Sequence, residues 1–149
     1  MISDNIIDIL IIEDNPNDIE LTLRALKKIN IVNNIQVISD GEEALNYLFG
    51  KGKYKDRNLN NNPKVAFLDL KLPKVGGLEI LREVKSNKET KAMPVVVLTS
   101  SKEEQDIIES YKLGVNSYIV KPVDFEKFME SVKTLGMYWL LLNQLPGKN

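Results

Sequence analysis

Polar and charged side chains stand directly after several short apolar runs of this chain. They are three carboxylates, one hydroxyl and one lysine: Glu13, Asp14, Asp69, Thr99 and Lys121. Carboxylates that share a site raise one another's pKa unless cations compensate their charge. One Mg²⁺ ion and the lysine ammonium would compensate these three, and a carboxylate can attack phosphorus without a general base. The residue types therefore predict metal-assisted phosphoryl transfer.

Asp69 is the candidate nucleophile because of its place in the chain. The apolar run Val65–Leu68, bounded by Pro63 and Pro73, is typical of a parallel strand buried on both faces. Such a strand would deliver Asp69 to its carboxyl end, where open α/β sheets bind their ligands. An aspartate there can also simply start a turn. The polar residues after the other apolar runs are what favour a site.

Cysteine and histidine are both absent from the sequence. This excludes disulfides, thiolate nucleophiles, Cys-based zinc sites, Ser–His pairs and imidazole metal ligands. Any metal would be bound through oxygen, which favours Mg²⁺, with Mn²⁺ or Ca²⁺ as alternatives. A phosphohistidine involved in the function must belong to a partner.

The formal net charge of −1 gives the chain no general attraction to nucleic acid or to an anionic membrane. No apolar run approaches the ~20 residues of a membrane span, and the N-terminus does not resemble a signal peptide. The last predicted helix is too apolar and too poor in arginine to read bases. We therefore expect a cytoplasmic protein that binds neither nucleic acid nor a membrane.

Five repeats of a strand followed by a helix are predicted. The strands are apolar runs at Ile6–Ile12, Ile35–Ile38, Val65–Leu68, Val95–Leu98 and Asn116–Val120. The helix starts are marked by Asn15 before Pro16, Asp40 with Glu43, Gly76 with Gly77, Ser101 with Glu104, and Asp124. This alternation predicts an α/β fold with a doubly wound, parallel, five-stranded sheet and helices on both faces.

The segment Gly50–Pro63 is long for a loop in a compact domain and has no apolar periodicity. Its basic residues are Lys51, Lys53, Lys55 and Arg57. We expect a segment that is either mobile or used for contact.

The last predicted helix has a row of apolar residues, called the seam here, that continues past the part of the helix expected to pack on the sheet. The seam consists of Phe125, Phe128, Val132, Leu135, Trp139 and Leu142, widened by Tyr138, Leu141 and Leu145. We expect a single domain over residues 1–149, with a core at about 6–133 and a helical extension at about 134–149. We expect Tyr138–Leu145 to run past the sheet and to form a homodimer through the last helix, with folding back on the protomer as the alternative.

From about Ile6 to Lys133 the chain resembles a two-component response regulator receiver domain. The matching features are the acidic pair Glu13-Asp14, the run from Asp69 to Pro73 with Gly76-Gly77, the pair Thr99-Ser100, and Lys121-Pro122. The intervals of 30 residues from Asp69 to Thr99 and of 22 residues from Thr99 to Lys121 also match the family. The resemblance implies the flavodoxin-like strand order 2-1-3-4-5. It also implies that the Lys121–Pro122 peptide bond is cis.

The same resemblance implies a role for each site residue. Asp69 resembles the phospho-acceptor, and Lys121 the lysine that pairs with it and then with the phosphoryl group. Asp14 and the backbone carbonyl of Lys71 resemble direct Mg²⁺ ligands, completed by Asp69, while Glu13 acts through water.

Thr99 and Tyr118 resemble the family's switch pair, in which an aromatic ring follows the hydroxyl toward the phosphoryl group. From the residues alone, Tyr118 can also be a core aromatic on a strand, and Thr99 can be a turn residue without a switching role. The resemblance further implies a sensor histidine kinase as phosphodonor, self-catalysed dephosphorylation, and binding to a downstream protein as the output. The long loop and C-terminal extension are similar to single-domain regulators that partner phytochrome-like kinases.

Three other readings compete with this one. A phosphatase of the haloacid dehalogenase type would place a second carboxylate two residues after the nucleophile, where this chain has Lys71. A nucleotide or flavin binder would need a phosphate-binding glycine loop after the first strand, and none is present. A constitutive interaction module would not need the complete acidic, hydroxyl and lysine set.

Overall fold

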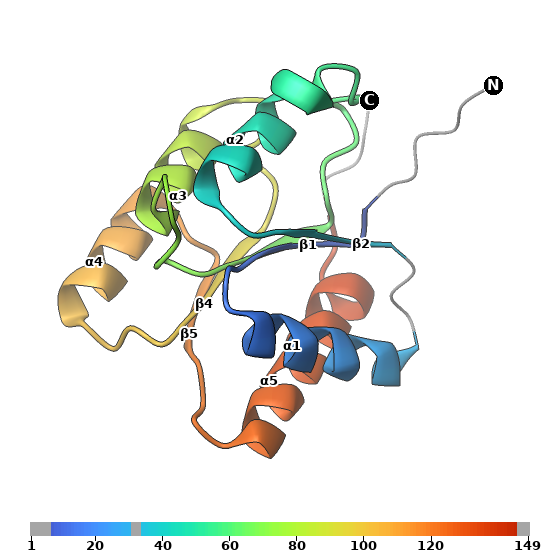
Figure 1. Ribbon diagram of the computed structural model, residues 1–149, viewed down its shortest axis with the longest axis vertical. Helices are drawn as coiled ribbons and strands as arrows, with labels where there is room; N and C mark the ends of the chain where they lie inside the picture. Colours follow the sequence, from blue (N-terminus) through green and yellow to red (C-terminus); the bar gives the residue numbers. More distant parts are fainter. Residues whose placement is uncertain (1–6, 31–33, 146–149) are drawn as a thin grey trace.

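The computed structural model describes residues 7–30 and 34–145. In these ranges five parallel strands form one sheet in the order β2-β1-β3-β4-β5, which confirms the predicted doubly wound, flavodoxin-like fold (Figure 1). The strands are β1 (Ile9–Ile12), β2 (Ile35–Ile38), β3 (Val65–Leu68), β4 (Val95–Thr99) and β5 (Ser117–Val120). Ile6, where the first strand was expected to begin, lies outside the described residues.

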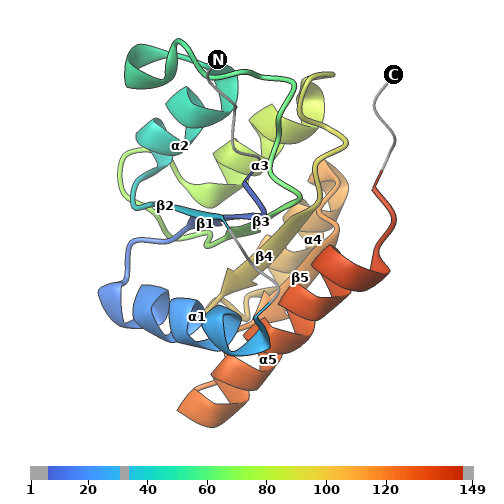
Figure 2. The same cartoon turned by 90° about the vertical axis from the view of Figure 1, so that its right-hand side faces the viewer.

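Helices cover both faces of the sheet. They are α1 (Pro16–Ile29), α2 (Gly41–Phe49), α3 (Gly77–Ser86), α4 (Glu104–Leu113) and α5 (Phe125–Met137), joined by a 3₁₀ turn η1 (Gly52–Tyr54) and a π-helical turn η2 (Tyr138–Leu142). Figure 2 shows α1 and α5 side by side on one face, with α2, α3 and α4 on the other. Within the described part of the chain, no helix is long and apolar enough to cross a membrane.

The three central strands are buried on both faces, which explains why their sequences are continuous apolar runs. Alternate side chains point to opposite layers. Ile9, Ile11 and Phe67 pack against α1 and α5, whereas Leu10 and Leu68 pack against α2 and α3. The two layers hold the carboxyl ends of the strands in fixed positions.

Side-chain caps begin three of the helices as the sequence predicts. The side chains of Asn15, Asp40 and Asp124 accept hydrogen bonds from backbone N–H groups in the first turns of α1, α2 and α5. The predicted capping box of Ser101 with Glu104 is wrong. Glu103 occupies the cap position, because the Ser101 hydroxyl accepts the Glu103 N–H two residues on and itself donates to Asp106 Oδ2 at 2.6 Å.

Gly77 allows α3 to approach the loop that follows β3. A Cβ added at this position would lie 2.4 Å from the backbone oxygen of Asp69, which no side chain can occupy. The Gly77 N–H donates to the Leu70 carbonyl at 2.9 Å. The start of α3 therefore fixes the backbone immediately after Asp69.

The segment Gly50–Pro63 is tied to α2 by three side chains, one of which is Lys53, whose Nζ lies 3.2 Å from Glu43 Oε2. The Arg57 guanidinium donates to the carbonyls of Tyr47, Leu48 and Asn61 at 2.7, 3.2 and 3.1 Å, and lies over the Tyr47 ring. The Tyr54 hydroxyl donates to Glu43. Arg57 therefore satisfies carbonyls at the C-terminal end of α2, which no intrahelical N–H can reach. Lys51, Lys53 and Lys55 are exposed around this anchor.

The C-terminal seam only partly matches its prediction. Phe128, Val132 and Trp139 are buried against the α1 face, but Phe125 and Leu142 are each 70% exposed. The exposure of Leu142 agrees with the expectation that Tyr138–Leu145 run past the sheet, whereas Trp139 in the same stretch is buried. This stretch begins with the π-helical turn η2, which is closed by a bond from the Asn143 N–H to the Tyr138 carbonyl. Phe125, at the first position of α5, lies beyond the packed part of the helix.

Replacing Arg57 with methionine should lower the free energy of unfolding by about 1–3 kcal/mol, because three carbonyls lose a charged donor. Urea unfolding at neutral pH measures this change. Lys55→Met, an exposed neighbour in the same loop, is the matched control and should unfold like the wild type. Equal stability of both variants would show that the Arg57 anchor contributes nothing.

Candidate functional site

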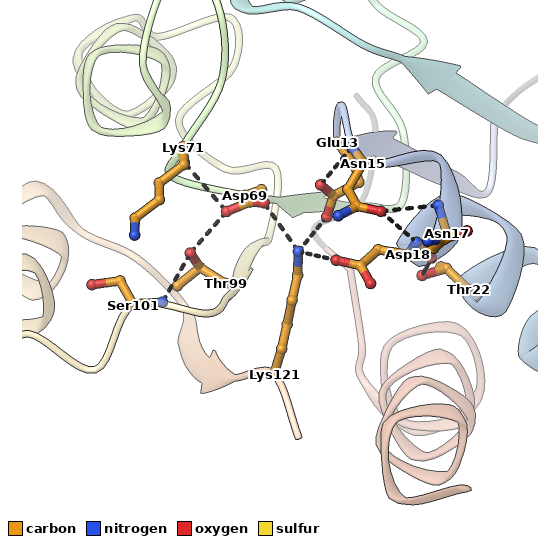
Figure 3. Close-up of polar contacts among 10 residues, drawn as sticks. All are labelled: Glu13, Asn15, Asn17, Asp18, Thr22, Asp69, Lys71, Thr99, Ser101 and Lys121. Atoms are coloured by element: carbon orange, nitrogen blue, oxygen red, sulfur yellow. Dashed lines mark hydrogen bonds and ion pairs between the residues drawn. The ribbon is translucent and has the colours of Figure 1, made fainter. Parts of the chain in front are cut away.

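The residues that follow four of the strands meet at one edge of the sheet, as the sequence predicts. Glu13 follows β1, Asp69 follows β3, Thr99 ends β4 and Lys121 follows β5 (Figure 3). Glu13, Asp69 and Thr99 are buried. Parallel strands bring their carboxyl ends together, so residues far apart in the sequence form one polar cluster.

Lys121 lies at the centre of the cluster. Its Nζ donates to Glu13 Oε1 at 2.6 Å, Asp18 Oδ2 at 2.8 Å and Asp69 Oδ2 at 3.0 Å, and its side chain is only 8% exposed. An ammonium has three protons, so each is used in one of these bonds. One buried cation thus holds three carboxylates from three different elements.

Asp18 was not predicted as a site residue, although it is one of these three partners. The sequence indicates only an acid in the first turn of α1, which is favourable at a helix N-terminus. Asp18 could have been predicted as a site residue from its position. The helix begins directly after the Glu13-Asp14 pair, so its first turn must lie beside the same edge of the sheet.

The second oxygen of Asp69 is held by neutral donors. Asp69 Oδ1 accepts from Thr99 Oγ1 at 2.8 Å and from the Lys71 backbone N–H at 3.2 Å. The two oxygens are therefore distinguished, one facing the ammonium and the other facing β4 and the loop after β3. This fixes the orientation of the carboxylate.

Glu13, Asp14 and Asp69 can each offer one oxygen to a metal ion, and these three oxygens lie within 4.8 Å of one another. Asp14 is exposed, whereas the other two are buried. Carboxylate oxygens with one side open to water fit a divalent ion such as Mg²⁺ or Mn²⁺, which keeps several waters. The role of the Lys71 carbonyl as a fourth ligand stays a prediction.

The electrostatics of the cluster follow from burial and from the ammonium. Burial raises the pKa of Glu13 to about 7, although Lys121 opposes this shift. Burial alone would also raise the pKa of Asp69, but Lys121 and the Thr99 hydroxyl outweigh it and lower that pKa. Burial would lower the pKa of Lys121, but its bonds to Asp18 and Glu13 raise it above the usual value. The metal-free site therefore holds more negative charge than one lysine neutralises.

Tyr118 and Thr99 are connected through Ser101 rather than by direct contact. The Tyr118 hydroxyl donates to the Ser101 carbonyl at 3.0 Å, and the Ser101 N–H donates to Thr99 Oγ1 at 3.4 Å. Tyr118 is half-buried at the α2–α3 side of the core. The predicted switch pair thus shares one backbone residue, and its switching role stays a prediction.

The expected cis peptide bond between Lys121 and Pro122 is wrong. No peptide bond in the described residues is cis, so this one is trans. The two isomers of a bond before proline differ by only about 0.5–1 kcal/mol, so the residue types alone do not decide between them.

Comparison with known families agrees with the fold and the residues at this edge of the sheet. The family model of the response regulator receiver domain matches residues 9–133. The chain therefore belongs to the response regulator receiver domain family, whose members act in two-component signalling.

Three relatives are similar to nearly the whole chain. Response regulator Rcp1 of Synechocystis sp. is 37% identical over 139 residues, which cover 93% of this chain and 92% of Rcp1. The phosphorylated cyanobacterial phytochrome response regulator RcpA has a TM-score of 0.87 at 39% identity and covers 93% of this chain and 97% of RcpA. The bacteriophytochrome response regulator AtBRR is 51% identical with a TM-score of 0.72, covering 94% of this chain and 99% of its own.

Receiver domains bind a divalent metal, and Rcp1 has been solved in a Mn²⁺-bound form. That structure has a TM-score of 0.87 to this chain at 37% identity and covers 93% of this chain and 98% of Rcp1. Glu13, Asp14 and Asp69 form an acidic cluster in this chain that could hold a metal ion.

The raised pKa of Glu13 predicts a pH dependence of stability for the metal-free protein. The folded state binds the Glu13 proton more tightly than the unfolded state, whose carboxyl has an ordinary value of 4.5. The stabilising contribution is therefore complete below about pH 4.5 and is lost as the pH rises through about 7. We expect a loss on the order of 1–3 kcal/mol between pH 5 and pH 8.

Urea unfolding in EDTA across this pH range measures the loss. Glu13→Gln cannot titrate and should flatten the dependence, whereas Glu42→Gln, at an exposed acid in the first turn of α2, should leave it unchanged. A profile that stays steep in Glu13→Gln would assign the effect to another group.

Proposed function

We propose that this chain is a phospho-acceptor response regulator, in which Asp69 receives a phosphoryl group from the phosphohistidine of a partner sensor kinase. The observation that supports this most directly is the position of Asp69. Its two oxygens are fixed between Lys121 on one side and Thr99 with the Lys71 N–H on the other, beside the acidic pair Glu13-Asp14. This arrangement presents a buried, oriented nucleophile at an edge that carries metal ligands.

The chemistry needs no general base. An oxygen of the Asp69 carboxylate forms a bond to phosphorus while the bond between phosphorus and the kinase histidine breaks, and the histidine keeps the bonding electrons. Lys121 and Thr99 already contact the two oxygens of Asp69, so small shifts bring the ammonium and the hydroxyl to the phosphoryl oxygens. Positioned charges of this kind stabilise the transition state. Attack by water on phosphorus would break the bond between phosphorus and the Asp69 oxygen, releasing inorganic phosphate and returning Asp69 to a free carboxylate.

A Mg²⁺ ion, or Mn²⁺ in its place, would neutralise phosphoryl charge when bound. The residues that would hold it are Asp14, Asp69 and the Lys71 carbonyl directly, with Glu13 acting through water. The Mn²⁺-bound form of Rcp1 and the cluster of three carboxylates support this assignment.

The proposed output is a change in protein binding. Movement of the Thr99 hydroxyl toward a phosphoryl group would disturb its bond to the Ser101 N–H, and Tyr118 bonds to the carbonyl of the same residue. The ring of Tyr118 would then respond to the state of Asp69, shifting the balance between two conformations. The affected surface is formed by α4, β5 and α5.

The phosphorylation itself is tested with acetyl phosphate and Mg²⁺. We expect an acid-stable, base-labile adduct of one phosphoryl mass on the wild type and none on Asp69→Asn, measured by intact-mass spectrometry. Asp56→Asn, an exposed aspartate in the loop after α2, is the control and should be modified like the wild type. Steady hydrolysis of generic phosphate esters without an adduct would instead indicate a phosphatase.

The proposed partners are a phytochrome-like sensor kinase, a downstream protein and a second copy of this chain. RcpA is a cyanobacterial phytochrome response regulator and AtBRR a bacteriophytochrome response regulator, which supports the kinase class. The homodimer is supported by an exposed apolar surface near the C-terminal end, formed by Met137, Tyr138, Leu141, Leu142 and Leu145. Trp139 and Leu140 pack against the core of the protomer, whereas the five residues of this surface face the solvent.

A charge within this surface should weaken the dimer. Gel filtration with light scattering at micromolar concentration is expected to show a dimer for the wild type and a monomer for Leu142→Glu. Tyr111→Glu, an exposed aromatic on α4, is the control and should stay dimeric. A wild type that is monomeric both before and after acetyl phosphate treatment would rule out the homodimer.

A further inference from the structure

We propose that Asp18 is the positioning residue for Lys121, holding the ammonium in place while its two other carboxylate partners change state during phosphoryl transfer. This inference rests on the proposed function and deepens it. It concerns a carboxylate that the sequence analysis treated only as part of the first turn of a helix.

The three partners of Lys121 are not equivalent. Glu13 and Asp69 both belong to the cluster whose oxygens can hold a metal ion, whereas Asp18 does not. Asp69 is also the proposed nucleophile. Asp18 is therefore the one carboxylate on Lys121 that neither binds metal nor reacts, and its oxygen lies 2.8 Å from Nζ.

Asp18 is presented by a rigid part of the fold. Its backbone N–H donates to the Asn15 cap at 3.2 Å, and its carbonyl accepts the Thr22 hydroxyl at 2.7 Å. These bonds fix the first turn of α1, which packs against α5. Figure 3 shows Asp18 and Asp69 approaching the ammonium from different sides, so the bond to Asp18 holds the ammonium independently of the bond to Asp69.

The need for this anchor follows from the reaction. A metal ion bound at the cluster would compete for Glu13, and phosphorylation would convert the free carboxylate of Asp69 into an acyl phosphate. Both bonds to the ammonium would then weaken as Lys121 moves to the phosphoryl oxygens. A lysine stem has many rotamers and holds its position only while its head is bound. Asp18 keeps the ammonium beside the reacting oxygen, where a misplacement of about 1 Å can cost up to ~100-fold in rate.

The proposal is tested with Asp18→Asn, which keeps the shape of the side chain and removes its charge. At saturating Mg²⁺ and acetyl phosphate, we expect the rate of Asp69 phosphorylation to fall at least about 5-fold. Mg²⁺ affinity, measured by calorimetry, should stay within about threefold of the wild type, because Asp18 is not a ligand. Glu20→Gln, an exposed acid two residues on, is the control and should keep the wild-type rate.

Two further variants separate positioning from a general structural effect. In a Lys121→Met background, Asp18→Asn should cause no additional loss of rate, because the two residues act as a pair. Asp18→Glu, which keeps the carboxylate on a longer chain, should have a rate between those of Asp18→Asn and the wild type. If Asp18→Asn does not fold, the comparison of Asp18→Glu with the wild type decides, and equal rates count against the proposal.

Several results would overturn the role of Asp18. They are a wild-type rate in Asp18→Asn, an equal loss of rate in the Lys121→Met background, and a loss of Mg²⁺ affinity as large as the loss of rate. These outcomes differ from failure of the proposed function, in which the wild type itself forms no adduct on Asp69.

Discussion

The burial of several like charges around one ammonium is the constraint on which the rest of this structure depends. Glu13 and Asp69 are almost completely buried, and their side chains share one lysine with Asp18. Removing charges from water is costly unless they are paired with good geometry. The cluster can persist only because the ends of β1, β3 and β5 and the start of α1 are held close together. The sheet and its two helical layers supply that rigidity.

The loop after β3 illustrates how packing serves the site. The backbone beyond Asp69 is fixed by the start of α3, where only glycine fits at position 77. The start of α2 makes a similar contact, since a Cβ on Gly41 would overlap the Val75 carbonyl. Two helix starts thus determine where the Lys71 N–H meets the Asp69 carboxylate. The geometry of the nucleophile depends on main-chain contacts that carry no charge.

The β4–α4 connection links the site to the surface. Ser101 bonds to Thr99 through its N–H, to Tyr118 through its carbonyl and to Asp106 through its hydroxyl. A displacement of the Thr99 hydroxyl is therefore transmitted to a half-buried ring and to the first turn of α4. Coupling of this kind needs a contiguous set of contacts with two stable arrangements. The hydrogen bonds of Ser101 are the contacts of one such arrangement, the one with Asp69 unmodified.

The sequence by itself determined the alternation of strands and helices, three of the side-chain caps, and the set of polar residues at the strand ends. These features are local: apolar periodicity, cap residues and position after a strand can be read within a few residues. Parallel pairing then brings Glu13, Asp69, Thr99 and Lys121 to one edge. The fold and the predicted core of the candidate site follow from these patterns.

Only the tertiary structure decided which groups share Lys121, how the long loop is anchored and how the last helix ends. Asp18 and Lys121 are 103 residues apart, and the contact exists because α1 packs beside α5. Arg57 caps α2 through carbonyls that any residue type provides. The last helix ends in a π-helical turn in which Trp139 packs into the core while Leu142 is exposed. Each of these contacts joins residues that are distant in the sequence or depends on how helices pack. The local sequence around each residue is compatible with other contacts, so it does not specify which one forms.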